Sequence, residues 1–390
     1  MTDHRDPEAG LRFNRGPTRS VPGENVPDQP LEGTALCLSG GGYRAMLFHL
    51  GGLWRCNELG LLPELDCVSA VSGGAIAASA LAIAWPALDL DDAGMARAFA
   101  QRVVAPLREL ASRTIDRRAV LTGLLLPGGT NNRLAAAYRR YLLGDHALAD
   151  LPERPDFVFT ATNLQAGSLW MFSRRAISDF RVGRIENPDF DLAGAVAASS
   201  AFPPFLSPAL LRFAAGVYAP SSGRDLQKLP FTTRPALTDG GVYDNLGLEA
   251  AFKLYRTILV SDAGAHISDA PRAARTWGMA MLRVTHVIDN QVRELRKQRL
   301  IESYDAGERD GAFWAIRSDV ENFPLETALP APSHRTERLA SLPTRLAALD
   351  TINQQRLINW GYAAADAALR AHVRPNAPAP ERFPYPAAAV

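Results

Sequence analysis

A serine in a glycine-rich turn is the first residue whose surroundings suggest chemistry. Ser72 lies in the run Ala70-Val71-Ser72-Gly73-Gly74, one residue away from the G-x-S-x-G elbow that exposes a nucleophilic serine between a strand and a helix. Ala70 replaces the first glycine of that elbow, while the two later glycines keep the following turn permissive. Ester cleavage by acyl transfer begins with such a hydroxyl, so Ser72 is the candidate nucleophile. The alternative interpretation is a simple helix cap.

A second glycine run offers donors for a negative charge. Gly40, Gly41 and Gly42 follow a short apolar segment, and adjacent backbone N–H groups in such a turn can point at one oxygen atom. Arg44 could add a fixed positive charge, and Gly73 adds an N–H group directly after the candidate nucleophile. We expect these groups to stabilise the oxyanion of a tetrahedral intermediate.

A carboxylate in a third glycine-rich segment is the candidate base. Asp239 lies in Thr238-Asp239-Gly240-Gly241, where the glycines allow the backbone to approach a partner closely. An isolated Asp-Gly-Gly is usually only a turn. The catalytic interpretation is favoured because ester hydrolysis needs a nucleophile, a base and oxyanion donors together, and all three are present.

The elements that must hold these residues follow a repeated order. The apolar runs 34–38 and 67–71 are typical of buried strands, and helices are expected from Arg44 and from Ala75 onward. Further apolar runs of this kind lie at 157–162 and 257–261. The sequence therefore predicts an α/β fold, a three-layer α/β/α sandwich with a mostly parallel central sheet and helical additions. Sites in such sheets collect beyond the carboxyl ends of the strands.

The remaining segments surround this core. We expect a flexible leader at 1–32, one domain at 33–372 and a Pro-rich tail at 373–390. The domain is expected to contain a helical insertion at about 91–150 and an irregular cap region at about 203–235. Its last helix is predicted at roughly 342–372.

A long amphipathic helix is predicted from Trp277. Its apolar stripe consists of Trp277, Met281, Val284, Ile288, Val292 and Leu295, and an opposite basic group includes Arg293, Arg296, Lys297 and Arg299. We interpret this as a helix packed on the core through its stripe. A membrane-facing surface is the alternative.

The composition excludes several classes of function. The 42 basic and 41 acidic residues nearly cancel, so we expect no nucleic-acid partner. Three cysteines lie in apolar segments without the spacing of metal ligands, and we expect buried free thiols, no metal and no cofactor. No apolar stretch reaches the ~20 residues that span a bilayer, and no secretory signal is visible. We expect a cytoplasmic protein, with peripheral membrane contact left open.

The glycine-rich segments together resemble the patatin-like phospholipase family. The motifs that carry the resemblance are Ser-Gly-Gly-Gly-Tyr-Arg-Ala at 39–45, Ser-Gly-Gly at 72–74 and Asp-Gly-Gly at 239–241, with the stretches 161–165 and 198–204 similar to bacterial members. Ser39 and the Arg-Ala pair after the glycines resemble the cytosolic phospholipase branch, whereas many patatins have Asp and Gly at positions 39 and 45. The resemblance covers roughly 34–264.

This resemblance implies a patatin-like fold and a catalytic dyad without histidine. In such a dyad Asp239 takes the Ser72 proton directly, and the glycine loop forms the oxyanion hole. The expected substrates are lipids or other acyl esters, cleaved as by a phospholipase A, a lysophospholipase or a lipase.

Two other functions remain open from the sequence. Ser72, Asp239 and then His266 or His286 follow the chain order of an α/β-hydrolase triad. Gly40-x-Gly42-x-x-Ala45 fits the weaker spacing of a dinucleotide loop, as in a nucleotide-binding or regulatory module without hydrolysis.

Overall fold

Each of the first two glycine turns joins a strand to a helix, as the sequence predicts. Strand β1 (Leu31–Leu38) leads into α1 (Gly42–Glu58), and β2 (Leu65–Ala70) leads into α2 (Gly73–Ala84). The structure is a computed structural model that describes residues 30–117, 119, 129–265, 267, 271, 276–325 and 327–390.

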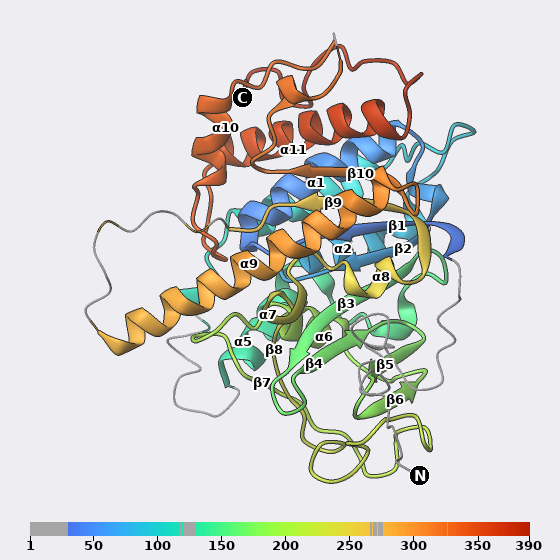
Figure 1. The fold of residues 1–390 in the computed structure, drawn as a ribbon, viewed down its shortest axis with the longest axis vertical. Helices are drawn as coiled ribbons and strands as arrows, with labels where there is room; N and C mark the ends of the chain where they lie inside the picture. The colour runs from blue at the N-terminus through green and yellow to red at the C-terminus, as the bar shows by residue number, and fades with distance from the viewer. Residues whose placement is uncertain are drawn as a thin grey trace, which may run out of the picture.

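One sheet organises the described residues (Figure 1). Its strand order is β10-β9-β1-β2-β3-β4-β5-β6, with β8 also paired to β3 and β7 to β8. The further strands are β3 (Asp156–Asn163), β4 (Ser168–Phe172), β5 (Ala176–Asp179), β6 (Gly183–Glu186), β7 (Ala209–Leu210), β8 (Ala236–Asp239), β9 (Tyr255–Asp262) and β10 (Asp310–Ala315). Strands β10, β9, β1, β2 and β3 are parallel, whereas β4 to β8 pair antiparallel.

Helices cover both faces of the sheet, so the predicted α/β sandwich is confirmed. The further α-helices are α3 (Ala105–Ala111), α5 (Gly129–Tyr138), α6 (Leu192–Ser199), α7 (Gly241–Asp244), α8 (Glu249–Phe252), α9 (Trp277–Asp305), α10 (Ser333–Ala340) and α11 (Thr351–His372). The antiparallel part of the sheet is not anticipated by the sequence analysis.

The two faces of the sheet bury unequal cores. Side chains alternate along a strand, and in β1 Leu36 and Leu38 belong to the large cluster that α1, α2 and α11 cover. Ala35 and Cys37 belong instead to a smaller cluster on the other face, which α8 and the buried Leu300 of α9 complete. Cys37, Cys56 and Cys67 are buried free thiols, as expected.

The C-terminal part departs from the expected boundaries. Helix α11 begins at Thr351, not near 342, because the Asp350 side chain caps it by accepting a hydrogen bond from the Asn353 N–H. The Pro-rich end has no helix or strand, but it packs against α11. The Asn359 side chain donates to the carbonyls of Tyr385 and Ala388, both at 2.8 Å.

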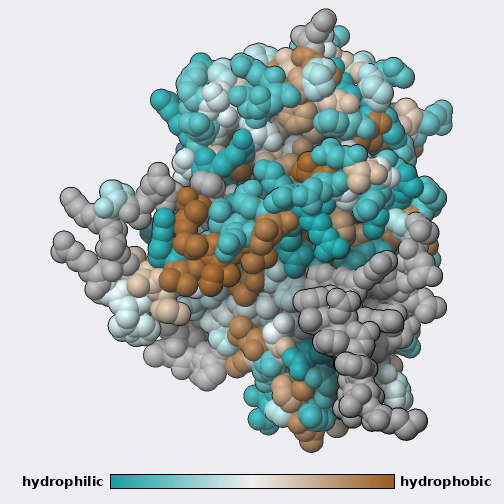
Figure 2. Space-filling view, viewed as in Figure 1, coloured by the Kyte–Doolittle hydropathy of each residue, from teal (hydrophilic) through white to brown (hydrophobic). Residues whose placement is uncertain are grey.

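Helix α9 contradicts the expectation that its apolar stripe packs on the core. The six stripe residues Trp277, Met281, Val284, Ile288, Val292 and Leu295, hereafter the α9 stripe, are between 38% and 85% exposed. The helix instead contacts the body through charged residues, with Arg296 paired to Glu249 at 2.9 Å. Figure 1 shows α9 crossing in front of the sheet with its N-terminal end extending beyond it, and Figure 2 shows apolar side chains gathered over that end.

Among the described residues, no helix combines the length and the apolar character needed to cross a membrane.

Candidate active site

Strand β3 brings Ser72 and Asp239 together, although 167 positions separate them in the sequence. Its first half pairs with β2, where Ala70 lies opposite Phe159. Its second half pairs with β8, where Asp239 lies opposite Ala161. Two residues along a strand span about 7 Å, so the end of β2 and the end of β8 meet beside the same short stretch of β3. Ser72 follows the first end, and Asp239 forms the second.

Ser72 occupies a strained turn of the nucleophile-elbow kind. Its φ of 50° and ψ of −113° place a non-glycine residue in a sparsely populated conformation. The Ser72 N–H donates to Ser199 Oγ at 2.9 Å, which holds the turn in place. The glycines after it allow close packing, because a Cβ at Gly73 would lie 2.3 Å from the Gly42 carbonyl oxygen. Ala70 is an ordinary buried strand residue here.

Asp239 is a buried carboxyl with a raised pKa. Its side chain is 3% exposed, and Oδ1 accepts a hydrogen bond from the Gly241 N–H at 2.8 Å. Burial raises the pKa of Asp239 to about 7, while the Gly241 N–H and the Ser72 side chain lower it. Oδ2 has no hydrogen bond in the described part of the chain, so the Ser72 contact falls short of an ordinary hydrogen bond. Such a carboxyl can accept a proton near neutral pH.

The glycine loop leaves only some of the expected N–H donors without an acceptor. Gly41 and Gly42 have φ values of 147° and 62°, which favour glycine. The Gly40 N–H donates to the Asn245 carbonyl at 3.0 Å, so it is not free to bind an oxyanion, contrary to expectation. Within the described residues the N–H groups of Gly41, Gly42 and Gly73 have no acceptor.

Arg44 does not offer the free charge that the sequence suggests. Its guanidinium is 3% exposed and donates to three backbone carbonyls, those of Ala340, Leu342 and Ala263, at 2.7–3.0 Å. Burial lowers the pKa of Arg44 to about 10. The side chain therefore ties α1 to two distant segments through its two terminal nitrogens, and Nε alone has no hydrogen bond in the described part of the chain.

Several residues that support this site have no assigned role in the sequence analysis. Thr162 Oγ1 donates to the Asp239 carbonyl at 2.8 Å, and the Asp239 N–H donates to the Ala201 carbonyl at 3.0 Å. Ser199 and Ala201 belong to the stretch 198–204, and Thr162 to 161–165. The family resemblance of these two stretches was the available signal, but it did not reveal that they position Ser72 and Asp239.

The described histidines form no contact with this site. His49 is buried in α1, where Nδ1 is 2.7 Å from Ser261 Oγ and Nε2 is 2.9 Å from the Ser39 carbonyl oxygen. Burial lowers the pKa of His49 to about 4. His286 is exposed on α9, and His266 lies outside the described residues. No histidine in the described ranges is hydrogen-bonded to Ser72 or Asp239, and those ranges hold no cluster of potential metal ligands.

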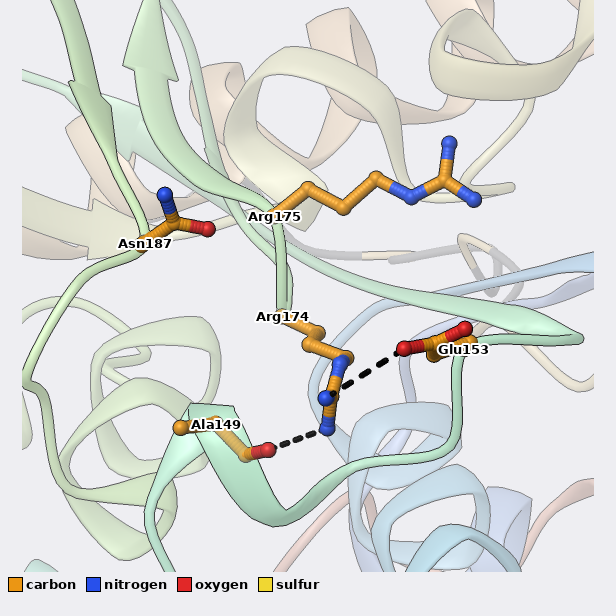
Figure 3. Close-up of a pocket in the computed structure, with 5 residues that line it drawn as sticks. All are labelled: Ala149, Glu153, Arg174, Arg175 and Asn187. Atoms are coloured by element: carbon orange, nitrogen blue, oxygen red, sulfur yellow. Dashed lines mark hydrogen bonds and ion pairs between the residues drawn. The ribbon is translucent and has the colours of Figure 1, made fainter.

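The surface pockets do not coincide with this site. One of about 400 Å³ is lined by Ala149, Glu153, Arg174, Arg175 and Asn187 (Figure 3). Arg174 there donates to the carbonyls of Ala149 and Leu151 and pairs with Glu153 at 3.7 Å. The pocket wall is thus held by the chain's own polar contacts, and neither Ser72 nor Asp239 lines it.

Comparison with known structures finds distant relatives. The human GIVD cytosolic phospholipase A2 in complex with methyl gamma-linolenyl fluorophosphonate is 13% identical with a TM-score of 0.44, over 86% of this chain and 57% of that one. VipD from Legionella pneumophila is 16% identical with a TM-score of 0.34, over 86% of this chain and 66% of that one. The chain thus spans less than two thirds of either structure's length. Among curated proteins no sequence matches.

A match to the sequence model of a protein family shows which family this chain belongs to. The model described as "Patatin-like phospholipase" matches residues 36–252, which include all three glycine-rich segments. This match covers more than half of the chain. The chain therefore belongs to the patatin-like phospholipase family.

Proposed function

We propose that this protein hydrolyses carboxylic ester bonds of lipids with Ser72 as nucleophile and Asp239 as general base. The observation that carries the proposal is the meeting of the two residues beside β3, with Ser72 in a strained turn and Asp239 buried with its pKa raised to about 7. Family membership supports a hydrolase of lipids. Phospholipase A, lysophospholipase and lipase activities are the candidates.

The reaction begins with proton transfer to Asp239. As the proton leaves, Ser72 Oγ bonds to the ester carbonyl carbon, and the carbonyl oxygen becomes an oxyanion. The free N–H groups of Gly41, Gly42 and Gly73 are the proposed donors to that oxygen. When the intermediate collapses, the bond to the alcohol breaks and Asp239 returns the proton to the leaving alkoxide.

Water completes the cycle by the same chemistry. Asp239 takes a proton from a water molecule, whose oxygen attacks the acyl-enzyme carbonyl. Collapse of the second tetrahedral intermediate releases the fatty acid, and the proton returns to Ser72 Oγ. No cofactor takes part in these steps, because every proton and bond is accounted for by Ser72, Asp239, the ester and water.

Hydrolysis and covalent labelling test the proposal. Ser72→Ala should abolish turnover of p-nitrophenyl esters and phospholipids and should also abolish labelling by a fluorophosphonate probe. Ser79→Ala is the matched control, because Ser79 is a buried serine of the same helix whose hydroxyl donates only to the Ile76 carbonyl. Labelling of a folded Ser72→Ala protein at the parent level would contradict the assignment.

We also propose that the α9 stripe contacts lipid aggregates. The stripe lies on the helix that borders the catalytic region, because α9 packs against α7, which begins two residues after Asp239 and exposes Val242. Asp289 of α9 also acts electrostatically on Asp239. An exposed apolar surface of this extent is typical of an interaction site, and Trp277 at its end is a residue type that favours the membrane interface. Co-sedimentation with phospholipid vesicles tests this contact.

A further inference from the structure

Arg293 is a buried cation whose hydrogen-bonding capacity is largely unused. It lies on the inner side of α9 and is 5% exposed. One nitrogen, Nη2, donates to Asn290 Oδ1 at 3.2 Å, but Nε and Nη1 have no hydrogen bond within the described residues. Because a buried donor without an acceptor is costly, this arrangement indicates that an acceptor is missing.

Two carboxyl groups face this guanidinium without using those donors. Asp262 Oδ2 is 4.0 Å from Nε, and the other Asp262 oxygen accepts a hydrogen bond from the Gly264 N–H. Asp289, one turn earlier on α9, interacts with Arg293 electrostatically, and burial raises the pKa of Asp289, which favours its neutral form. The positive charge is held in place, while the Nε and Nη1 protons remain available.

A chain of close contacts connects Arg293 to the nucleophile. A Cβ at Gly264 would lie 2.1 Å from Arg293 Nη1 and 2.8 Å from Asn245 Nδ2, so only a glycine admits the guanidinium here. Asn245 accepts the Gly40 N–H through its carbonyl. A Cβ at Gly40 would in turn lie 2.4 Å from Asn245 Oδ1 and 3.3 Å from Ser72 Cβ. A single residue, Asn245, thus lies between the Arg293 guanidinium and Gly40 of the glycine loop.

The contrast with Arg44 identifies which arginine is available to a ligand. Arg44 lies on the helix that follows the glycine loop, and three backbone carbonyls occupy its terminal nitrogens. Arg293 approaches the same loop from the opposite face of the sheet, and two of its nitrogens have no acceptor in the described part of the chain. An anionic group of a bound substrate could satisfy both.

We propose that Arg293 binds the phosphate of a phospholipid headgroup while the acyl ester lies at Ser72. A guanidinium matches phosphate because its fork of N–H donors can bind two phosphate oxygens at once. The proposal rests on the proposed function and narrows its substrate class, since a neutral acylglycerol has no anionic group to pair with the buried guanidinium.

A pair of substrates that differ only in the headgroup tests this subsite. The assay compares monomeric dihexanoylphosphatidylcholine with 1,2-dihexanoylglycerol, for the parent and for Arg293→Met. Loss of a charge-assisted hydrogen bond predicts that kcat/KM for the phospholipid falls about ten- to hundredfold. The diacylglycerol rate should hardly change. Arg293→Lys should give an intermediate loss, because an ammonium group keeps the charge without the fork.

Control variants separate this role from a structural one. Arg299→Met is the matched control, because Arg299 is an exposed arginine of α9 whose guanidinium lies over the Phe252 ring. If Arg293→Met does not fold, Arg293→Gln provides a second route, since its neutral amide keeps a polar side chain but removes the charged fork of donors. It should show the same loss restricted to the phospholipid.

Several outcomes would overturn the proposal. An equal loss on both substrates would assign Arg293 a structural role, and unchanged rates on both would exclude contact with the headgroup. A higher Ki for hexanoate with an unchanged phospholipid rate would identify the fatty-acid carboxylate as the ligand instead. A fully active Ser72→Ala protein would contradict the proposed function itself, which distinguishes that failure from failure of the phosphate subsite.

Discussion

The two faces of the sheet use apolar side chains differently. On the face of α1, α2 and α11, apolar residues are buried in one large cluster, and this face positions Ser72 at the start of α2. On the other face, a smaller cluster that includes Leu300 of α9 is buried, while α9 directs its stripe into solvent and forms ion pairs with the body. The comparison teaches that both faces bury apolar side chains, whereas the second also leaves an apolar surface uncovered. The proposed catalytic pair lies where elements of both faces meet, because Ser72 leads into α2 on one face and Asp239 leads into α7, which contacts α9 on the other.

The largest expected effect concerns that meeting point. Asp239→Asn keeps the shape of the side chain but removes proton acceptance, so kcat should fall by about three to four orders of magnitude. His286→Ala, on the exposed side of α9, should leave most activity. Steady-state kinetics on a p-nitrophenyl ester measure both, with the exposed Asp310→Asn as control. A folded His286→Ala protein without turnover would instead favour a triad.

The next largest effect is a difference in the free energy of unfolding between substitutions on the two faces. Leu47 is fully buried in α1, and Leu47→Ala should lower the free energy of unfolding by about 2–5 kcal/mol, because it leaves a cavity. Ile288 belongs to the α9 stripe, and Ile288→Ala should change the free energy of unfolding by no more than about 0.5 kcal/mol. Urea unfolding measures both values. A large loss in Ile288→Ala would mean that the stripe is covered in solution.

The pH dependence should follow the carboxyl of Asp239. Only its charged form accepts a proton, so kcat/KM should fall about tenfold for each pH unit below the pKa of about 7. Its folded-state pKa lies above that of an unfolded aspartate, so its contribution to stability is full at low pH and is lost as pH rises through about 7. Urea unfolding of the parent and of Asp239→Asn at pH 5 and pH 8 checks this sign. A pH-independent difference between the two proteins would contradict it.

The smallest expected effect concerns binding at the α9 stripe. Ile288→Ser removes an exposed apolar side chain and should weaken vesicle co-sedimentation about tenfold. That factor corresponds to the lower end of the free energy gained when one such side chain is buried. Hydrolysis of monomeric esters should be unchanged. Thr285→Ser is the control on the same helix, since Thr285 is also exposed. If Ile288→Ser alters only a concentration-dependent dimer, the stripe binds a second copy of the chain.

Local features of this protein could be predicted from its sequence. The strands before 39 and 72 are short apolar runs followed closely by glycines, and Gly41 and Gly42 of the first turn have the positive φ that glycine favours. Ser72 and Asp239 became candidates because each directly precedes a pair of glycines. These features are visible in the sequence because a turn depends mainly on the residues within it.

The ends and faces of helices were harder to predict. The Asp350 cap that starts α11 is a local signal, but the apolar residues before it continued the helical pattern. The periodicity of α9 correctly marks a stripe, yet the same pattern fits a buried and an exposed face. The ion pairs with Glu249 and Asp262 decide its orientation, and these partners lie outside the helix.

The sequence by itself therefore determined the α/β fold, the glycine turns and the candidate residues Ser72 and Asp239. Only the tertiary structure decided that β3 aligns the two, that the Gly40 N–H is bound to Asn245, and that backbone carbonyls occupy both terminal nitrogens of Arg44. The physical reason is the range of the interactions. Turns and periodicity depend on neighbours along the chain, whereas hydrogen-bond acceptors come from whichever distant segment the sheet brings alongside.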